Sequence, residues 1–394
     1  MKILMVISQF NPIIGGAEKQ AQLLAKKLNE KGVGVNLITG WWKFGTPRKE
    51  MIDGIKVFRN FCFWGMFGIE TNRMIRMFGG ILYVISLGTY LFLHGREYDI
   101  IHVHQFLYPA FVCALIGRKI LKKPVLVKSA SSGGTSDLKL LRQVPLGSRQ
   151  LDFLLKEVEF LVAVSKATAN DFKEIGYSES RISHIPNGVE IPIAGKTNYN
   201  RVIQIATVTR LSQEKGVDVL LRSWAEVVGE IGNLKLLIVG DGPLESQLKA
   251  LSCSLGIAES VDFVGKVEDA FKFLEATDLF VLSSRSEGMS NALLEAMSYG
   301  IPCIATQAGG NRELLGAENE EISRGGYVLA KNGLLINPDD VRGLTEAILF
   351  FIRNRHKREE MGRRGRHYIE ENHSIDSVAE RYIALYQSLL NKRC

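Results

Sequence analysis

Several features that mark whole classes of protein are missing from this chain of 394 residues. The five cysteines are scattered, and no two have the CxxC spacing of a zinc site, so neither a metal centre nor a disulfide framework is indicated. The chain also lacks the GxGxxG dinucleotide fingerprint and the GxxxxGK[ST] P-loop. These absences disfavour a nicotinamide-dependent oxidoreductase, and reduced cysteines are typical of a cytoplasmic protein.

Targeting and membrane-spanning segments are not recognisable either. Residues 1–8 have the pattern of a first strand rather than a signal peptide. The apolar segment Met77–Leu93 has seventeen residues, fewer than the ~20 that a membrane-spanning helix needs. We interpret it as a buried helix, with an interfacial helix at a membrane face as the alternative.

The net charge of +7 conceals an asymmetry between the two parts of the chain. Residues 1–150 contain 21 Lys and Arg against 8 Asp and Glu, whereas the remainder contains 28 against 34. A basic first part favours an anionic partner, such as a membrane surface or an acidic substrate. No helix-turn-helix, zinc finger or aromatic RNA-binding motif accompanies this charge, so a nucleic-acid partner is not expected.

Strands and helices alternate along almost the whole sequence, which predicts an α/β fold with parallel sheets. In the first half, strands are expected at residues 2–7, 33–39, 55–58, 100–103, 125–128, 160–164 and 182–185, and helices at 17–30, 70–93, 107–120 and 166–174. In the second half, strands are expected at residues 202–208, 235–239, 261–264, 279–282, 302–305 and 334–336, and the segment 341–390 has a helical pattern throughout.

The length is too great for one compact core and predicts two domains. A tight turn at residues 185–189 and a short polar linker at residues 192–200 separate the two halves. We therefore expect one Rossmann-like domain at residues 1–193 and a second at residues 199–372. In such domains ligands bind at the carboxyl ends of the parallel strands.

The most informative segment is Ser286–Met297, in which Glu287 and Glu295 flank a Gly-Met-Ser-Asn turn. The apolar run 279–282 predicts a strand before this turn, and the run 292–299 predicts a helix after it. The free N–H groups at the start of that helix attract an anion, and the two carboxylates can accept hydrogen bonds from hydroxyl groups. A nucleotide sugar, with its diphosphate between two polyols, fits this arrangement.

A second loop, RLSQEKG, carries the cations Arg210 and Lys215 after the first expected strand of the second half. Two cations there could neutralise the charge that develops on a diphosphate leaving group; a solvated surface loop is the alternative. Gly240 and Gly242, in the segment GDGP, are expected either to border a nucleotide pocket or to form a structural turn.

Paired glycines also occur between the first expected strand and the first expected helix, where Gly15 and Gly16 begin the segment GGAE. Paired glycines let the backbone approach a ligand closely, and the start of the helix attracts phosphate. An ordinary strand–helix loop, with Glu18 as a favourable acid in the first turn, explains the same residues.

In combination, the segments GGAE, RLSQEKG, GDGP and EGMSNALLEAMSYGIPCIAT resemble the group 1 (family 4) retaining glycosyltransferases of the GT-B architecture, in the same order and over essentially the full length. The resemblance implies two Rossmann-like domains facing a central cleft, with the donor held mainly by the second. It also implies that a last helix, residues 373–394, crosses back onto the first domain. Such enzymes retain the anomeric configuration, and no protein nucleophile is established for them.

Carried onto this sequence, the resemblance makes Arg210, Lys215 and Glu287 the catalytic candidates. The two cations would bind the donor diphosphate, Glu287 would contact the hydroxyls of the donor sugar, and Glu295 would bind the ribose. The remaining donor-binding candidates are Gly15, Gly16, Gly240, Gly242, Gly288, Met289, Ser290 and Asn291.

The sequence departs from the family pattern after the expected strand 125–128. Many relatives have a histidine there that approaches the donor sugar, whereas this chain has a loop of serines and glycines. Ser131 and Ser132 in this loop, and His104 at the end of another strand, are the acceptor-side candidates. Lys128 could assist with charge or could be a solvated strand end, and we name no catalytic base.

We expect neither a metal nor a cofactor. No two aspartates have the Asp-x-Asp spacing of the metal-dependent GT-A enzymes, and the two cations with a helix dipole can supply the electrostatic stabilisation that a metal would give. His102 and His104 share a strand face, but no cysteine or carboxylate cluster accompanies them in the sequence.

The expected function is transfer of a sugar from a nucleoside-diphosphate sugar, most simply a UDP-sugar, to a saccharide or lipid-linked acceptor in cell-envelope polysaccharide or glycolipid synthesis. The expected place is the cytoplasm, with peripheral attachment to the inner face of an anionic membrane as a further possibility. The alternative from another class is a regulatory protein that binds a nucleotide sugar without turning it over. A phosphorylase on the same architecture would need a lysine that binds pyridoxal phosphate, and no feature of the sequence indicates one.

Overall fold

The computed structural model describes residues 1–13, 15–43, 45–62, 73–130, 138, 141–142, 147–267, 271–317 and 320–391, with the side chains of residues 73–78 left aside. The chain divides into two compact units. Unit 1 comprises Met1–Gly188 and Ile375–Cys394, and unit 2 comprises Val189–Ser374. The expected domains were residues 1–193 with the helix 373–394, and residues 199–372.

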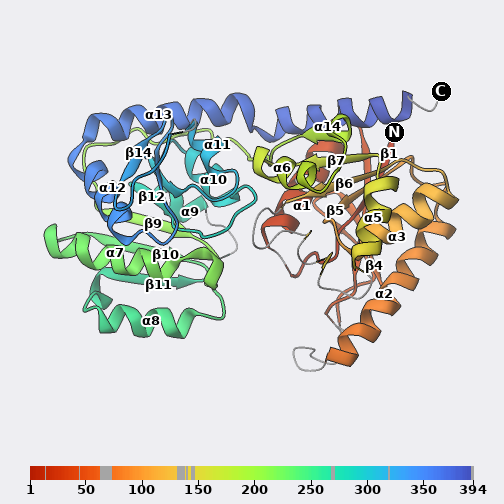
Figure 1. The fold of residues 1–394 in the computed structure, drawn as a ribbon, viewed down its shortest axis with the longest axis horizontal. Helices are drawn as coiled ribbons and strands as arrows, with labels where there is room; N and C mark the ends of the chain where they lie inside the picture. The colour runs from red at the N-terminus through yellow and green to blue at the C-terminus, as the bar shows by residue number, and fades with distance from the viewer. Residues whose placement is uncertain are drawn as a thin grey trace. The chain divides into compact units, whose positions relative to one another are not determined.

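Unit 1 is built on a single sheet with the strand order β3-β4-β2-β1-β5-β6-β7-β8. Figure 1 labels five of these strands: β1, β4, β5, β6 and β7. All neighbouring strands are parallel except β3 and β4, which form an antiparallel pair at one edge. The strands are β1 (Lys2–Val6), β2 (Gly34–Gly40), β3 (Lys49–Ile52), β4 (Ile55–Asn60), β5 (Ile100–His104), β6 (Val125–Ser129), β7 (Phe160–Ala163) and β8 (Ile182–His184). The sequence predicted all of them except β3.

Helices cover both faces of this sheet, and each face has its own apolar core. The helices are α1 (Gly16–Glu30), α2 (Arg73–Leu93), α3 (Tyr108–Val112), the π-helical η2 (Cys113–Ile120), α5 (Gly147–Glu157), α6 (Lys166–Glu174), the short η4 (Glu179–Arg181) and α14 (Ile375–Asn391). One core packs α1 and α14 against the sheet, and the other packs α2, α3 and α5 against the opposite face. The last helix of the chain therefore belongs to the first unit.

Helix α2 is amphipathic rather than fully buried. Tyr83, Leu87 and Leu91 are buried in the core of unit 1, whereas Ile81 and Ile85 are exposed on the other side of the helix. The expectation of a buried helix therefore holds for one face only. No helix among the described residues has the length and apolar content needed to cross a bilayer.

Unit 2 repeats the plan with the strand order β11-β10-β9-β12-β13-β15-β14, and only β14 and β15 are antiparallel. The strands are β9 (Gln204–Val208), β10 (Lys235–Val239), β11 (Val261–Gly265), β12 (Leu279–Leu282), β13 (Cys303–Thr306), β14 (Tyr327–Leu329) and β15 (Leu334–Ile336). The helices are η5 (Gln213–Lys215), α7 (Val217–Glu230), α8 (Glu245–Ser254), η6 (Ala258–Ser260), α9 (Phe271–Glu275), α10 (Asn291–Ser298), α11 (Asn311–Leu315), α12 (Val341–Arg353) and α13 (Arg355–Asn372). The sequence predicted every strand of this sheet except β14.

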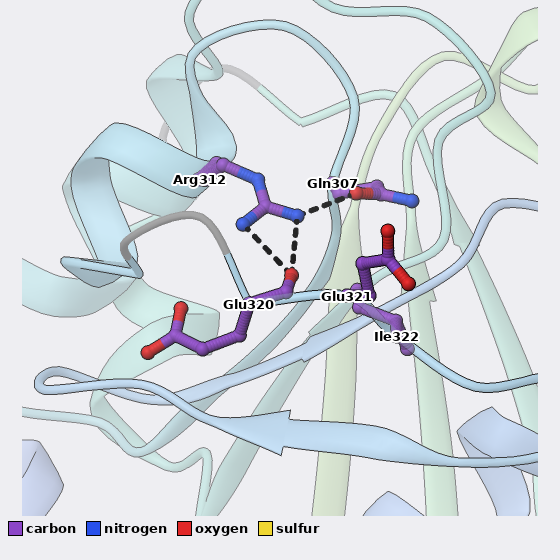
Figure 2. A pocket seen from close by; sticks show the side chains of 5 residues that line it. All are labelled: Gln307, Arg312, Glu320, Glu321 and Ile322. Atoms are coloured by element: carbon purple, nitrogen blue, oxygen red, sulfur yellow. Dashed lines mark hydrogen bonds between the residues drawn. The ribbon is translucent and has the colours of Figure 1, made fainter.

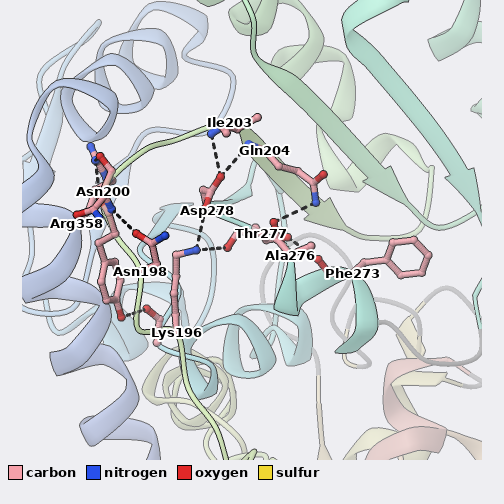
Figure 3. A network of polar contacts seen from close by, with 12 residues as sticks. Lys196, Asn198, Asn200, Ile203, Gln204, Phe273, Ala276, Thr277, Asp278 and Arg358 are labelled. Atoms are coloured by element: carbon pink, nitrogen blue, oxygen red, sulfur yellow. Dashed lines mark hydrogen bonds and ion pairs between the residues drawn. The ribbon is translucent and has the colours of Figure 1, made fainter.

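The expected linker at residues 192–200 is fixed to unit 2 rather than free. The Lys196 ammonium donates to the Thr277 carbonyl and to the Asp278 carboxylate, both at 2.9 Å (Figure 3). Arg358 donates to the Tyr199 carbonyl, also at 2.9 Å. The other oxygen of Asp278 accepts the N–H groups of Ile203 and Gln204, so the segment enters strand β9 along a fixed path.

Candidate functional site

The topology of unit 2 brings the predicted donor motifs to one edge of one sheet. Strands β10, β9 and β12 are neighbours and parallel, so their carboxyl ends lie side by side. Arg210 follows β9, Gly240 follows β10, and Glu287 follows β12. This is the edge at which open α/β sheets bind ligands.

The loop after β9 is held against the turn after β10. Thr209 N–H donates to the Val239 carbonyl at 2.9 Å, and Leu211 N–H donates to the Asp241 carbonyl at 2.8 Å. A Cβ atom on Gly240 would lie 1.9 Å from the Thr209 carbonyl oxygen. One on Gly242 would lie 2.4 Å from the Leu211 carbonyl oxygen. Both glycines therefore have a structural role, because they let the Arg210 loop pack on β10.

Lys215 and Glu287, which are distant in the sequence, form an ion pair at this edge. The distance between Lys215 Nζ and Glu287 Oε1 is 2.8 Å, and the two side chains are 22% and 9% exposed. Ser284 Oγ donates to the same carboxylate oxygen at 2.7 Å. Two of the three catalytic candidates are thus in direct contact, and a partly buried pair is screened less by salt than a surface pair.

The backbone beside Lys215 packs closely on the end of β12. Gly216 has a φ of +61°, and a Cβ atom there would lie 2.2 Å from the Ser283 carbonyl oxygen. Ser283 Oγ in turn donates to the Lys215 carbonyl at 3.1 Å. Position 216 requires glycine, because a side chain would be strained at this φ and would clash with the Ser283 carbonyl. The contact with Ser283 also fixes the position of Lys215 relative to the end of β12.

Arg210 is exposed, and its guanidinium makes no hydrogen bond or ion pair with a residue that the structure describes. Its charge acts on Glu214, which accepts a hydrogen bond from Ser212 Oγ at 2.5 Å. Burial raises the pKa of Glu214, but this hydrogen bond and the charges of Lys215 and Arg210 outweigh it, so the pKa is lowered overall. The Glu214 carboxylate therefore stays ionised, and the loop carries the two cations Arg210 and Lys215 beside one anion.

Arg285 is a residue that sequence reasoning missed, and it joins the segment after β12 to the start of α7 and to the turn after β15. Its guanidinium donates to both oxygens of Asp218, at 3.0 and 2.8 Å, and to Asp339 at 2.6 Å. The hydrogen bond to Asp218 is the largest cause of a raised pKa for Arg285. A fork of this kind fixes orientation as well as distance. Its signal in the sequence is weak, because its partners lie far along the chain.

The turn after Glu287 is held by a second pair of glycines that sequence reasoning also missed. Gly309 has a φ of +54°, and a Cβ atom there would lie 1.9 Å from the Glu287 carbonyl oxygen. Gly310 N–H donates to the Gly288 carbonyl at 2.8 Å. The available signal was a Gly-Gly pair in the loop between a predicted strand and the next helix, as at Gly15 and Gly16.

Helix α10 begins at this turn. Ser290 is its N-cap, and Ser290 Oγ accepts a hydrogen bond from Leu293 N–H at 3.3 Å. Met289 is buried, and Asn291, the first helical residue, is partly exposed. Glu295 lies one turn further along and is only 6% exposed on a helix whose other buried side chains are apolar except that of Ser298. The structure therefore places Glu287, Ser290 and Glu295 on one short segment.

In unit 1 the start of α1 is capped from within. Glu18 Oε2 accepts the Gly15 N–H at 2.9 Å. Burial is the largest influence on this carboxyl and raises its pKa, against backbone hydrogen bonds that lower it. Because the Gly15 N–H already donates to Glu18, the capping of α1 accounts for the Gly15 segment without a bound ligand. Contact of Gly15 or Gly16 with a donor stays a prediction.

Of the acceptor-side candidates, the structure describes His104 alone. His104 ends β5 and is buried, and Lys128 in β6 is its partner in the strand register. The expectation that Lys128 is a solvated strand end is wrong, because its side chain is buried. Ser131 and Ser132 lie outside the described residues. In the described part of the chain, no three His, Cys, Asp or Glu side chains group together as metal ligands.

Two surface pockets occur in unit 2. One, of about 390 Å³, lies beyond β13 and contains Arg312, which donates to Gln307 Oε1 at 2.7 Å and to the Glu320 carbonyl at 3.3 Å (Figure 2). The other, of about 480 Å³, adjoins Asp218 and Arg285. Neither Arg210 nor the Lys215–Glu287 pair is among the described residues that line these two pockets.

Comparison with known families gives two matches that together span most of the chain. The model described as "Glycosyl transferases group 1" matches residues 193–368, and the one described as "Glycosyltransferase Family 4" matches residues 14–191. The first match contains all the predicted donor residues of unit 2.

Curated relatives include glycosyltransferases that are named for different products. N-acetyl-alpha-D-glucosaminyl L-malate synthase of Bacillus anthracis is 24% identical over 391 residues, covering 96% of this chain and 95% of the relative. A GDP-mannose-dependent phosphatidylinositol monomannoside mannosyltransferase of Corynebacterium glutamicum is 30% identical over 267 residues, covering 61% of this chain and 66% of the relative.

Solved structures share the fold over the whole length. Sucrose-phosphate synthase from Thermosynechococcus elongatus superposes with a TM-score of 0.77 at 18% identity, covering 100% of both chains. Anabaena HepE in complex with UDP-glucose gives a TM-score of 0.75 at 19% identity, covering 98% of this chain and 100% of the other. The two parallel-sheet units are those of the GT-B architecture.

Proposed function

This chain belongs to the group 1, family 4 glycosyltransferases, and from that premise we propose that it transfers a sugar from a nucleoside-diphosphate sugar, most simply a UDP-sugar, with retention of configuration. The acceptor is a saccharide or lipid-linked molecule of cell-envelope polysaccharide or glycolipid synthesis. The observation that carries the donor site is the Lys215–Glu287 ion pair at the carboxyl edge of the unit 2 sheet, with Arg210 exposed on the neighbouring loop.

The proposed donor orientation follows from the charges at this edge. Lys215 carries three N–H donors, so it can keep its hydrogen bond to Glu287 and still donate to a phosphate oxygen. Arg210 can bind two phosphate oxygens with one planar fork. The two cations then stabilise the diphosphate as it leaves, which lowers the barrier without a bound metal. We accordingly propose activity that needs neither a divalent ion nor a cofactor.

In this proposal the two carboxylates bind opposite ends of the donor. Glu287 is held by Ser284 and Lys215 at the end of β12 and faces the donor sugar, while Glu295 accepts hydrogen bonds from the ribose. The N–H groups at the start of α10 lie between them and favour the diphosphate. The glycines after β10 and β13 act through the backbone, because they hold the two loops that carry these side chains.

The choice among nucleotides rests on the relatives. Two solved structures of the same fold are complexes with UDP and UDP-glucose, whereas the Corynebacterium relative is named for GDP-mannose. A titration of UDP-, GDP- and ADP-sugars tests the choice, because a ligand that binds only the native state raises its melting temperature. We expect the largest rise with a UDP-sugar. Equal responses to the three nucleotides, or none, would count against it.

Turnover separates this function from that of a nucleotide-sugar-binding regulator. We expect the purified protein to hydrolyse its donor slowly and to transfer the sugar faster when acceptor is present, with unchanged rates after EDTA treatment. A donor that binds tightly but is never cleaved would support the regulator. Activity lost with EDTA and restored by a divalent ion would contradict a metal-independent reaction.

We also propose that unit 1 lies against a membrane through the exposed apolar strip of α2. The strip consists of Ile81, Ile85, Phe92 and Leu93. Arg96 and Lys122, both exposed, lie just after α2 and after the adjoining η2. Apolar side chains flanked by cations are typical of a surface that rests on anionic lipid. This position would give access to a lipid-linked acceptor.

A further inference from the structure

Three side chains that carry positive charge or can do so are buried together on one face of the unit 1 sheet. His102 and His104 lie two residues apart on β5 and therefore share a face. Lys128 is the register partner of His104 on β6 and points to the same side. His102 is fully buried, and His104 and Lys128 are each 4% exposed.

At one end of this cluster only one ring nitrogen of His102 has a partner, since His102 Nε2 is buried without a hydrogen bond to any described residue. His102 Nδ1 lies 2.7 Å from the Tyr386 hydroxyl of α14, and its ring stacks on that of His104 with centroids 4.3 Å apart. The ring of Tyr382, one turn earlier on α14, covers His102 with centroids 5.2 Å apart. His102 is thus fixed by packing within unit 1.

The other end lacks partners. His104 Nε2 is buried and makes no hydrogen bond with any residue that the structure describes. Over the same residues, Lys128 Nζ has neither a hydrogen bond nor an ion pair, although most buried charges are paired. Buried polar groups are hydrogen-bonded in almost all native structures, so an unpartnered imidazole nitrogen beside an unpaired lysine calls for an explanation.

The ionisable groups of the cluster are all basic. Burial lowers the pKa of Lys128 to about 8, and burial followed by the charges of His102 and Lys128 holds the pKa of His104 well below its usual range. None of these shifts includes a contribution from a described carboxylate. Removing a cation from water without a counter-charge is costly. An anion bound at Lys128 would offset that cost.

We propose that Lys128 Nζ and His104 Nε2 bind an anionic group of the acceptor, a carboxylate or a phosphate, at the carboxyl ends of β5 and β6. Lys128 supplies the charge, and neutral His104 donates its Nε2 hydrogen to a second oxygen of the same group. The identification of this anion as part of the acceptor rests on the proposed function. The excess of Lys and Arg in residues 1–150 favours approach of such a molecule.

Direct binding of two small probes tests the site. Inorganic phosphate and malonate are titrated into the full-length protein by calorimetry at pH 7, at constant ionic strength, with chloride as the reference salt. We expect saturable binding of at least one probe, and the stronger of the two identifies the acceptor group as phosphate or carboxylate. Lys128→Met should weaken binding by about ten- to a hundredfold, the value of a charge-assisted hydrogen bond.

Lys56→Met is the matched control, because Lys56 is an exposed lysine on β4 of the same unit. It should bind the probes as the wild-type protein does. His104→Gln provides a second variant that keeps a donor but moves it, with a smaller expected loss. No saturable binding in the wild-type protein, or equal binding by Lys128→Met and Lys56→Met, overturns the proposal.

A donor titration on the same samples separates this proposal from the proposed function. Binding of a UDP-sugar uses unit 2 and should be unchanged in Lys128→Met. Donor binding without probe binding overturns the anion site alone. Probe binding that is lost in Lys128→Met, in a protein that binds no nucleotide sugar, keeps the site but ends its assignment to a glycosyl acceptor.

Discussion

Lys215 Nζ lies 2.8 Å from Glu287 Oε1, across a gap of 72 positions in the sequence. The lysine ends the short helix after β9, and the glutamate follows β12, the neighbouring strand in the sheet. The ion pair therefore joins the two loops that the donor phosphate and the donor sugar would contact.

We expect the Lys215–Glu287 pair to be more strongly coupled than a surface ion pair. A double-mutant cycle with Lys215→Met and Glu287→Gln should give a coupling free energy of about 1–3 kcal/mol, because both side chains are largely buried. The matched cycle at the more exposed Lys249–Glu245 pair of α8 should give about 0.3–0.5 kcal/mol. Urea denaturation measures both. Equal couplings would show that the pair at the sheet edge is an ordinary surface contact.

Gly216→Ala should destabilise the protein strongly, since a Cβ atom at that positive-φ position would lie 2.2 Å from the Ser283 carbonyl oxygen. We expect a loss of about 2–4 kcal/mol in the free energy of unfolding, from strain and overpacking together. The control is Gly229→Ala, where a Cβ atom meets nothing within 4 Å inside helix α7. That substitution should stabilise the helix by about 0.5–1 kcal/mol. Similar stabilities for the two variants would contradict the close packing of this loop.

The unfolding free energy should fall when the pH drops below about 6.5, the pKa of a histidine in an unfolded chain. Burial lowers the pKa of His102 and of His104, so below that pH the unfolded state takes up protons that the native state does not. Each group contributes a slope of about 1.4 kcal/mol per pH unit. His104→Gln should remove about half of the slope that the two histidines cause. An unaltered slope in His104→Gln would argue against burial of that ring.

Binding to vesicles tests the membrane surface of unit 1. Vesicles containing anionic lipid should bind the wild-type protein, and simultaneous replacement of Ile81, Ile85 and Phe92 by Ser should weaken binding by at least about tenfold, because three apolar groups no longer enter the interface. The control is Leu329→Ser, which replaces an exposed leucine of unit 2. The same sedimentation of all three proteins with the vesicles, or no sedimentation of any, would rule out docking through α2.

Parallel strands and donor motifs were predictable because each leaves a local signal. Apolar runs such as Leu279–Leu282 are long enough to indicate a buried strand, and motif order along the chain gives their order at one sheet edge. Strands β3 and β14 were missed because both are short, lie at sheet edges and have side chains that are partly or wholly exposed. Nothing in their patterns resembles a buried parallel strand.

Contacts between distant segments were beyond the sequence. The roles of Arg285 and Gly309 depend on Asp218 and on the Glu287 carbonyl, which meet them only after two parallel strands are side by side. The burial of Lys128 is of the same kind. A lysine at the end of a predicted strand is ordinarily solvated, and only the structure shows that this one lies buried beside His104.

The most direct test of the donor site compares donor turnover by the wild-type protein, Arg210→Ala and Arg222→Ala. Both arginines are exposed in unit 2, but Arg222 lies on helix α7 away from the strand ends. Arg210→Ala should lower kcat by about a hundredfold or more while weakening donor affinity much less, since its charge acts mainly on the departing diphosphate. Arg222→Ala should react like the wild-type protein. Equal turnover by all three would contradict the assignment of the diphosphate to this edge of the sheet.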